Sequence, residues 1–206
     1  MPEKTADGWK IFHILTIGIN GSGWNEISGW LNNELKSYRL KKQKEFEEWY
    51  EEYKHRCLME PYIKVYISFE LETLTAGDLL EQGPENCSLT GIDGLWYTLD
   101  GKREKFRNNL DILTQIRDKY DDLLKNIPAI YLITKLGQGP FITKEELLKN
   151  LIKLKMDPYM KELEETYPSS ILEMIHVSIT TINMAFYFMA KKSVFYYTVK
   201  QINPKK

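Results

Sequence analysis

The chain has 206 residues, of which 43% are hydrophobic and 13% aromatic, so it can bury one sizeable core and is not a disordered tail. Its 28 basic and 29 acidic residues leave a net charge of −1, which argues against a general nucleic-acid coat or a polybasic membrane binder. No apolar run approaches the roughly 18 residues of a membrane span, and the polar N-terminus has no signal-peptide core. We therefore expect a soluble, cytoplasmic protein.

The first strong element follows a short polar segment. We expect residues 1–8 to form a flexible tail and residues 9–203 to form a single domain. Residues 9–19 are apolar on both alternating faces, which is typical of a strand inside a sheet. A glycine-rich turn ends this strand, and apolar residues at helical spacing then continue to about Cys57. The spacing predicts a long helix, or two helices with a bend, over residues 25–57.

The middle of the chain alternates strands and helices. Residues 62–72 alternate between apolar and polar side chains, which predicts a strand with one buried and one solvated face, as in antiparallel sheets. Asp100 is predicted to cap an amphipathic helix that ends at Pro128. The other predicted elements are a helical turn near Gly77, short strands over 94–99 and 129–135, and a helix that begins with the capping box Thr143–Glu146.

The last forty residues have the pattern of a meander. Three apolar segments, 171–181, 182–190 and 193–202, are predicted to be consecutive antiparallel strands. The whole order predicts an α+β fold, with a mostly antiparallel sheet, helices packed mainly on one face, and a long helix after the first strand. A parallel strand–helix–strand unit at the N-terminus is the alternative.

The glycine-rich turn, Gly18-Ile-Asn-Gly-Ser-Gly23, resembles the P-loop of nucleotide-binding proteins, in which backbone amides cradle phosphate. The resemblance covers only the turn. Trp24 and Asn25 stand where that motif has Lys and Ser or Thr, so the phosphate-binding charge and the magnesium-binding hydroxyl are missing. Phosphate binding by Gly21, Ser22 and Gly23 is retained as a hypothesis, because amides at the start of a helix are free.

The segment His176-Val-Ser178 resembles half of the signature of the two-histidine phosphoesterases. That resemblance implies one His as base, one as acid, and hydroxyl groups that hold the phosphate. The second half would be His13-Ile-Leu-Thr16, which has one residue too many and places His13 and Thr16 on opposite strand faces. The candidate catalytic set is therefore His13, Thr16, His176 and Ser178, provided that both histidines share one open cleft.

Other site chemistries are weaker in this sequence. Neither the three histidines nor the two cysteines have metal-ligand spacing, so we predict neither a metal nor a cofactor. A basic run gives a possible nucleic-acid contact, although acidic residues follow it directly, as on an ordinary mixed-charge helix surface. Its members are Lys36, Arg39, Lys41, Lys42 and Lys44.

The sequence favours an interaction protein over an enzyme. Tyr and Trp are favoured where proteins bind one another, and the predicted long helix carries several of them. Our leading hypothesis is a non-enzymatic interaction or regulatory protein that binds a macromolecular partner or itself, through that helix or a sheet edge. The alternatives are a two-histidine phosphodiesterase and a nucleotide or phosphate sensor that uses the glycine-rich turn. The candidate interface residues are Trp30, Tyr38, Trp49 and Tyr53.

Overall fold

The structure is a computed structural model of the chain, and part of the chain can be described in it. The described residues are 3–4, 9–19, 21–29, 66–82, 91–124, 127–156, 170–178, 180–182, 184–185, 188–189 and 192–193. Side chains are described for a subset of these. Among the described residues, no helix is long and apolar enough to cross a membrane.

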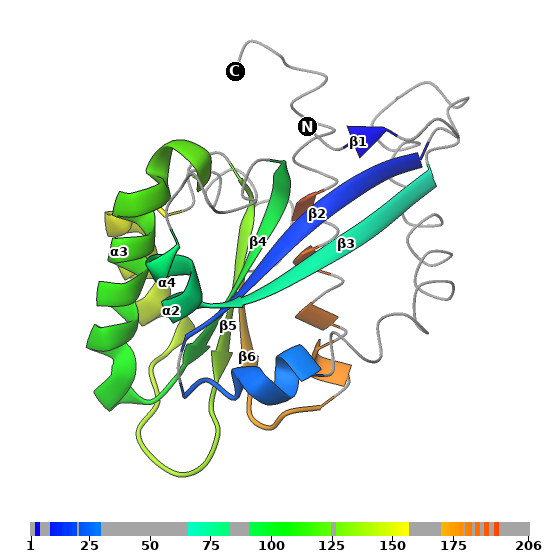
Figure 1. Cartoon of the computed structure of the whole chain (residues 1–206). Helices are drawn as coiled ribbons and strands as arrows, with labels where there is room; N and C mark the ends of the chain where they lie inside the picture. Colours follow the sequence, from blue (N-terminus) through cyan, green and yellow to red (C-terminus); the bar gives the residue numbers. More distant parts are fainter. Residues whose placement is uncertain are drawn as a thin grey trace, which may run out of the picture.

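Five parallel strands form the centre of the structure (Figure 1). They lie in the order β3-β2-β4-β5-β6, and a two-residue strand, β1 (Glu3–Lys4), pairs antiparallel with β2. The bounds of the five are β2 (Trp9–Gly18), β3 (Tyr66–Thr75), β4 (Ile92–Asp100), β5 (Ala129–Thr134) and β6 (Ile171–Met174). Numbered along the chain, the parallel strands have the order 2-1-3-4-5, which is the flavodoxin-like type of α/β fold.

The prediction of a mostly antiparallel α+β sheet is therefore wrong. The predicted strand over residues 62–72 exists as β3, but it pairs parallel with β2, from Trp9 opposite Tyr66 to Gly18 opposite Thr75. Its one-sided polar pattern misled the prediction, because among the described strands β3 pairs with β2 alone and so has the position of an edge strand. The apolar faces of residues 9–19 correctly indicated an internal strand, since β2 pairs with both β3 and β4.

The predicted C-terminal meander is also wrong. Among the described residues of this segment, only Ile171–Met174 form a strand, and those between 180 and 193 are helical, while residues 194–202 of the third predicted strand lie outside the described residues. Ser178 begins this helical segment, because its Oγ accepts a hydrogen bond from the Thr181 amide at 3.2 Å. Ile182, Ala185 and Met189 are buried at spacings of three and four residues, so their apolar run has the period of a helix rather than of strands.

Helices cover both faces of the sheet, not mainly one as predicted. On the first face lie α2 (Ala76–Glu81), α3 (Phe106–Leu124) and α4 (Lys144–Leu154), which appear together beside the sheet in Figure 1. The predicted capping box at Thr143 is confirmed, and Thr75 forms a second one at the start of α2.

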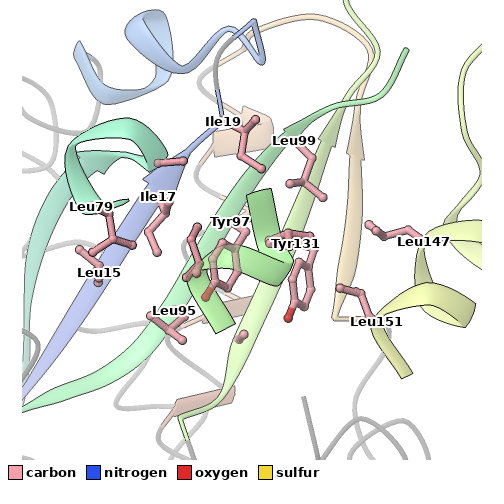
Figure 2. Close-up of a cluster of buried hydrophobic side chains, with 14 of the residues drawn as sticks. Leu15, Ile17, Ile19, Leu79, Leu95, Tyr97, Leu99, Tyr131, Leu147 and Leu151 are labelled. Carbon is pink, nitrogen blue, oxygen red and sulfur yellow. The ribbon is translucent and has the colours of Figure 1, made fainter. Parts of the chain in front are cut away.

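The core on this first face is built from alternate strand residues and the inner sides of the three helices. Figure 2 shows this cluster, in which the Tyr97 and Tyr131 rings of neighbouring strands stack with centroids 5.2 Å apart. Its labelled members are Leu15, Ile17, Ile19, Leu79, Leu95, Tyr97, Leu99, Tyr131, Leu147 and Leu151.

The second face is covered in part by the C-terminal helical segment. A Cβ on Gly94 of β4 would lie 2.5 Å from Ser193 Oγ and 2.8 Å from Met189 Cε, so this segment packs directly against the backbone of β4 at Gly94. Lys192 is 5% exposed, and its Nζ donates hydrogen bonds to the Ala129 carbonyl at 2.6 Å and to Ser170 Oγ at 2.7 Å. This buried ammonium therefore ties the C-terminal segment to the starts of β5 and β6.

We predict that Lys192→Met lowers the free energy of unfolding by about 2–4 kcal/mol, because a buried carbonyl and hydroxyl lose a charged donor. Urea unfolding followed by circular dichroism measures this. Lys149→Met, at an exposed position of α4, is the matched control and should change stability by less than about 0.5 kcal/mol. Equal effects of the two substitutions would show that the Lys192 hydrogen bonds do not anchor the segment.

Candidate site at the switch point of the sheet

The order of the strands reverses between β2 and β4. In open parallel sheets, ligands bind outside the carboxyl ends of the strands at such a switch point. Here β2 ends in the glycine-rich turn and β4 ends at Asp100. The turn and Asp100 lie next to each other, because a Cβ on Gly21 would lie 3.3 Å from Asp100 Oδ2. The fold therefore places the P-loop-like turn where a ligand site is expected.

Asp100 is a residue of this site that the sequence analysis assigned to another role. It does not cap the following helix as predicted, because it is the last residue of β4 and a 3₁₀ turn, η1 (Arg103–Lys105), precedes α3. It is 5% exposed, and its Oδ1 accepts a hydrogen bond from the Lys102 amide at 3.0 Å. An Asp directly after an apolar strand was the sequence signal that could have identified it.

The turn itself is tightly folded. Gly21 and Gly23 have φ values of 86° and 71°, in the left-handed region that glycine adopts without strain. A Cβ on Gly23 would lie 2.6 Å from Leu136 Cδ1 and 3.8 Å from Val177 Cγ2, so the turn packs against the loops that follow β5 and β6. Ser22 between them is fully buried, and its amide donates to the Ile19 carbonyl at 3.1 Å. The predicted phosphate-binding residues Gly21, Ser22 and Gly23 are thus at the site.

Trp24 fills the space above the start of this turn. It is 6% exposed, and a Cβ on Gly18 would overlap its ring atoms Cγ, Cδ1 and Cδ2. Residues 15, 17 and 19 face the first-face core, so the missing side chain of Gly18 would point to the second face, where the indole lies. The residue at the position of the P-loop lysine therefore folds back over the first glycine of the motif.

The charges described around the turn are mainly negative. The Asp100 carboxylate lies beside Gly21, and Glu26 Oε2 lies 3.8 Å from the place of a Cβ on Gly23. Lys135, which follows β5, is paired with Glu173 of β6 at 2.9 Å. A phosphate at the turn would therefore lie near two carboxylates, whereas a neutral or cationic group would not be repelled.

The structure does not bring the four candidate catalytic residues together. His13 lies in the middle of β2, where its amide donates to Asp93 Oδ2 at 3.2 Å, and His176 is exposed beyond the end of β6. Two strands separate β2 from β6, which alone amounts to roughly 14 Å. Thr16 is buried within β2, and Ser178 caps the C-terminal helical segment. The shared cleft that a two-histidine phosphodiesterase requires is not formed by these positions.

Other candidate residues lie outside the described part of the chain. These are the interface residues Trp30, Tyr38, Trp49 and Tyr53 and the basic residues Lys36, Arg39, Lys41, Lys42 and Lys44. Of the predicted long helix over residues 25–57, residues 25–29 are described and are helical. Within the described residues, no group of three or more His, Cys, Asp or Glu side chains is placed to hold a metal ion.

Comparisons with known proteins add little to this site. No family profile and no curated protein matches the chain. Among solved structures, the flavodiiron protein from Giardia intestinalis aligns with a TM-score of 0.42 and 9% sequence identity. The alignment covers 89% of this chain and 36% of that chain, so this chain spans about a third of its length. The fold is therefore assigned from the strand order, and the site from its own geometry.

We predict that substitutions of Gly18 and Trp24 have strongly non-additive effects on the free energy of unfolding. Gly18→Ala should cost about 1–3 kcal/mol because its methyl group collides with the indole, and Trp24→Ala about 3–5 kcal/mol. The cost of the double variant should be smaller than the sum of the two single costs by about 1 kcal/mol or more, because the added methyl group has no indole to collide with once Trp24 is Ala. Urea denaturation of the wild type, the two single variants and the double variant measures this double-mutant cycle.

The control for this cycle is Gly29→Ala, where a Cβ would meet no atom within 4 Å. Its effect should be neutral or stabilising by up to about 1 kcal/mol, because Gly29 is helical and exchanging Gly for Ala favours a helix. Additive costs of the Gly18 and Trp24 changes would mean that the indole does not occupy the space of the missing side chain.

Proposed function

We propose that this chain is a non-enzymatic interaction or regulatory protein of the cytoplasm, which binds a macromolecular partner or another copy of itself. The observation that supports this most directly is the position of Trp24. At the switch point, where this architecture normally receives a ligand, a side chain of the protein is already packed. A binding function located elsewhere on the surface agrees with such a filled site better than catalysis at the turn does.

The chemistry of the turn supports the same proposal. A P-loop needs a Lys for the β- and γ-phosphates and a hydroxyl for Mg²⁺, and this chain has Trp24 and Asn25 there. The carboxylates of Asp100 and Glu26 near the glycines add repulsion to any phosphate. Both features make tight binding of a nucleotide triphosphate unfavourable.

Two kinds of surface could carry the interaction. The predicted helix over residues 25–57 carries Trp49 and Tyr53, and buried Trp and Tyr side chains often supply most of the binding energy of an interface. The alternative surface is an edge of the sheet, where an added strand would pair through main-chain hydrogen bonds. Among the described strands, β3 and β6 have a single partner strand each. We favour the helix because it supplies the aromatic side chains.

We predict that Trp49→Ala together with Tyr53→Ala weakens self-association or partner binding by at least about tenfold, while unfolding stays cooperative. Native mass spectrometry of the purified protein gives its assembly state first. Light scattering after size exclusion, over a range of concentrations, then compares the variant with the wild type.

The matched control is Ile152→Ala, which removes an apolar side chain that is 53% exposed on α4. It should leave assembly unchanged. Unchanged binding by the Trp49 and Tyr53 variant would exclude the helix as the interface. A wild-type monomer whose melting temperature rises with magnesium and a nucleoside triphosphate would instead support a nucleotide sensor.

A further inference from the structure

We propose that the outward face of α4 is the docking surface for the acidic side of the predicted helix over residues 25–57, supplied by a second copy of this chain. The inference rests on the proposed function, in which the chain binds itself through that helix, and it names the surface that receives the helix. Three features support it: the lysines on the outer side of α4, the backbone strain at one of them, and the spacing of the glutamates in the predicted helix.

Three exposed lysines, Lys149, Lys153 and Lys155, lie in the last two turns of α4 and at its C-cap. Leu147 and Leu151 are buried in the first-face core, so this helix turns its other side, with Lys149 and Lys153, to solvent. Within the described residues, no salt bridge joins any of the three lysines to a carboxylate. They therefore form a local positive patch, which we call the basic face of α4, on a chain whose net charge is −1.

Lys155 carries backbone strain that a residue chosen for stability would avoid. Its φ of 54° and ψ of 33° lie in the left-handed region, and among the described residues it is the only one other than glycine with a positive φ. Gly or Asn usually occupies this position after a helix, because other side chains are strained there. A cation also interacts favourably with the end of a helix, but Lys153 already supplies one in the last turn. A lysine at position 155 is therefore better explained by a contact of its charge with a partner.

The segment of residues 45–53 has the complementary charge. It contains five glutamates and four aromatic residues, and at 3.6 residues per turn the two kinds occupy opposite sides of the predicted helix. The acidic side is made of Glu45, Glu47, Glu48, Glu51 and Glu52, and the aromatic side of Phe46, Trp49, Tyr50 and Tyr53. An interface that buries Trp49 and Tyr53 would therefore have glutamates along its rim, where charged residues normally lie.

The spacing of the charges matches between the two helices. Glu48 and Glu52 are four residues apart, and so are Lys149 and Lys153, so each pair spans about 6 Å along its helix axis. Two helices packed side by side can therefore form two ion pairs at once, in either relative direction. Ion pairs at the rim of an interface contribute chiefly to specificity and to the rate of association.

A second copy can present its acidic side to α4 more readily than the chain's own segment can. Residues 19–65 connect β2 to β3, and β3 lies at one end of the order β3-β2-β4-β5-β6. The helix α4 follows β5 and packs against β6, at the other end of that order, and the four spacings between β3 and β6 amount to roughly 19 Å. A contact between two copies does not have to cross the sheet. It can also be reciprocal, because each copy has one basic face and one acidic segment, and this permits a closed dimer.

Lys149→Glu with Lys153→Glu tests the proposal from the side of α4, and Glu48→Lys with Glu52→Lys tests it from the side of the predicted helix. Each double variant should raise the dissociation constant of the wild-type assembly at least about tenfold, because like charges then face each other. Sedimentation velocity over a range of concentrations in about 50 mM NaCl measures this, and the wild-type assembly should weaken in about 0.5 M NaCl because salt screens exposed charges. Circular dichroism should show cooperative unfolding of both variants.

An equimolar mixture of the two double variants gives a sharper test. One variant then has an acidic α4 and an acidic segment, and the other has a basic face and a basic segment. Opposite charges meet at both contacts of a mixed dimer and at neither contact of a dimer of one variant. The mixture should therefore form mixed dimers with a dissociation constant within about threefold of the wild-type value. With one variant isotope-labelled, native mass spectrometry identifies the mixed dimer by its mass.

Two control variants separate the basic face from general effects. Lys105→Glu with Arg107→Glu makes the same change in net charge at exposed positions outside α4, and it should leave assembly unchanged. Ile152→Ala removes an exposed apolar side chain that lies between Lys149 and Lys153 in sequence. It should also leave assembly unchanged, because the contact is made by the charges.

Three results would overturn the inference. A wild type that stays monomeric at low salt would do so, and it would limit the proposed function to an unlike partner. Assembly that survives both charge reversals but is lost in Trp49→Ala with Tyr53→Ala would overturn this inference alone. Loss of assembly in both double variants without recovery in their mixture would show that the two sets of charges do not meet.

Discussion

Parallel pairing of β2 on both of its sides is the constraint on which the rest of the structure depends. A parallel pair cannot be closed by a tight turn, so each neighbour of β2 must be reached through a crossover that covers a face of the sheet. The crossover from β2 to β3 contains residues 19–65, and helices lie on both faces. Because β2 is covered on both faces, its residues from Phe12 to Gly18 are buried except for the half-buried His13.

The same constraint creates the switch point and explains why Trp24 can occupy it. When β3 and β4 lie on opposite sides of β2, the loops after β2 and β4 diverge, and a crevice opens between their ends. Gly18 is the last residue of β2, so the chain that follows can fold directly back over it. Trp24, the first residue of the helix that follows, is buried there, and this burial stabilises the folded chain because an exposed indole would lose the hydrophobic contribution to folding.

Patterns local to one segment were readable from the sequence, and relations between segments were not. The apolar faces of residues 9–19, the capping box at Thr143 and the helix after it reflect local periodicity and local hydrogen bonds. Parallel or antiparallel pairing depends on which segments meet, and the alternation of residues 62–72 fits an edge strand of either kind. The C-terminal segment is rich in β-branched residues but has the burial period of a helix, so strand propensity alone predicts the wrong element there.

In the candidate site too, local features could be predicted from the sequence and contacts between distant segments could not. The glycine-rich turn could be identified from the sequence, because Gly18, Gly21 and Gly23 interrupt a strong strand. The position of Asp100 at the end of an apolar strand could mark it as a candidate, but its place beside the turn follows only from the pairing of β2 with β4. The distance between His13 and His176 likewise depends on how many strands lie between β2 and β6.

The two faces of the sheet are packed by different kinds of contact. The first face is packed by an almost wholly apolar cluster, whose aromatic members are Tyr97, Tyr120 and Tyr131. The second face buries the polar side chains of Thr16 and Thr98 in the strands and of Lys192 in the C-terminal segment. Buried side-chain atoms without a hydrogen-bond partner lie on both faces, since Trp96 Nε1 and Thr98 Oγ1 belong to the second face and Asn109 Oδ1 of α3 to the first. The helices of the first face are therefore held mainly by apolar burial, whereas the C-terminal segment is held on the second face by the Lys192 hydrogen bonds as well.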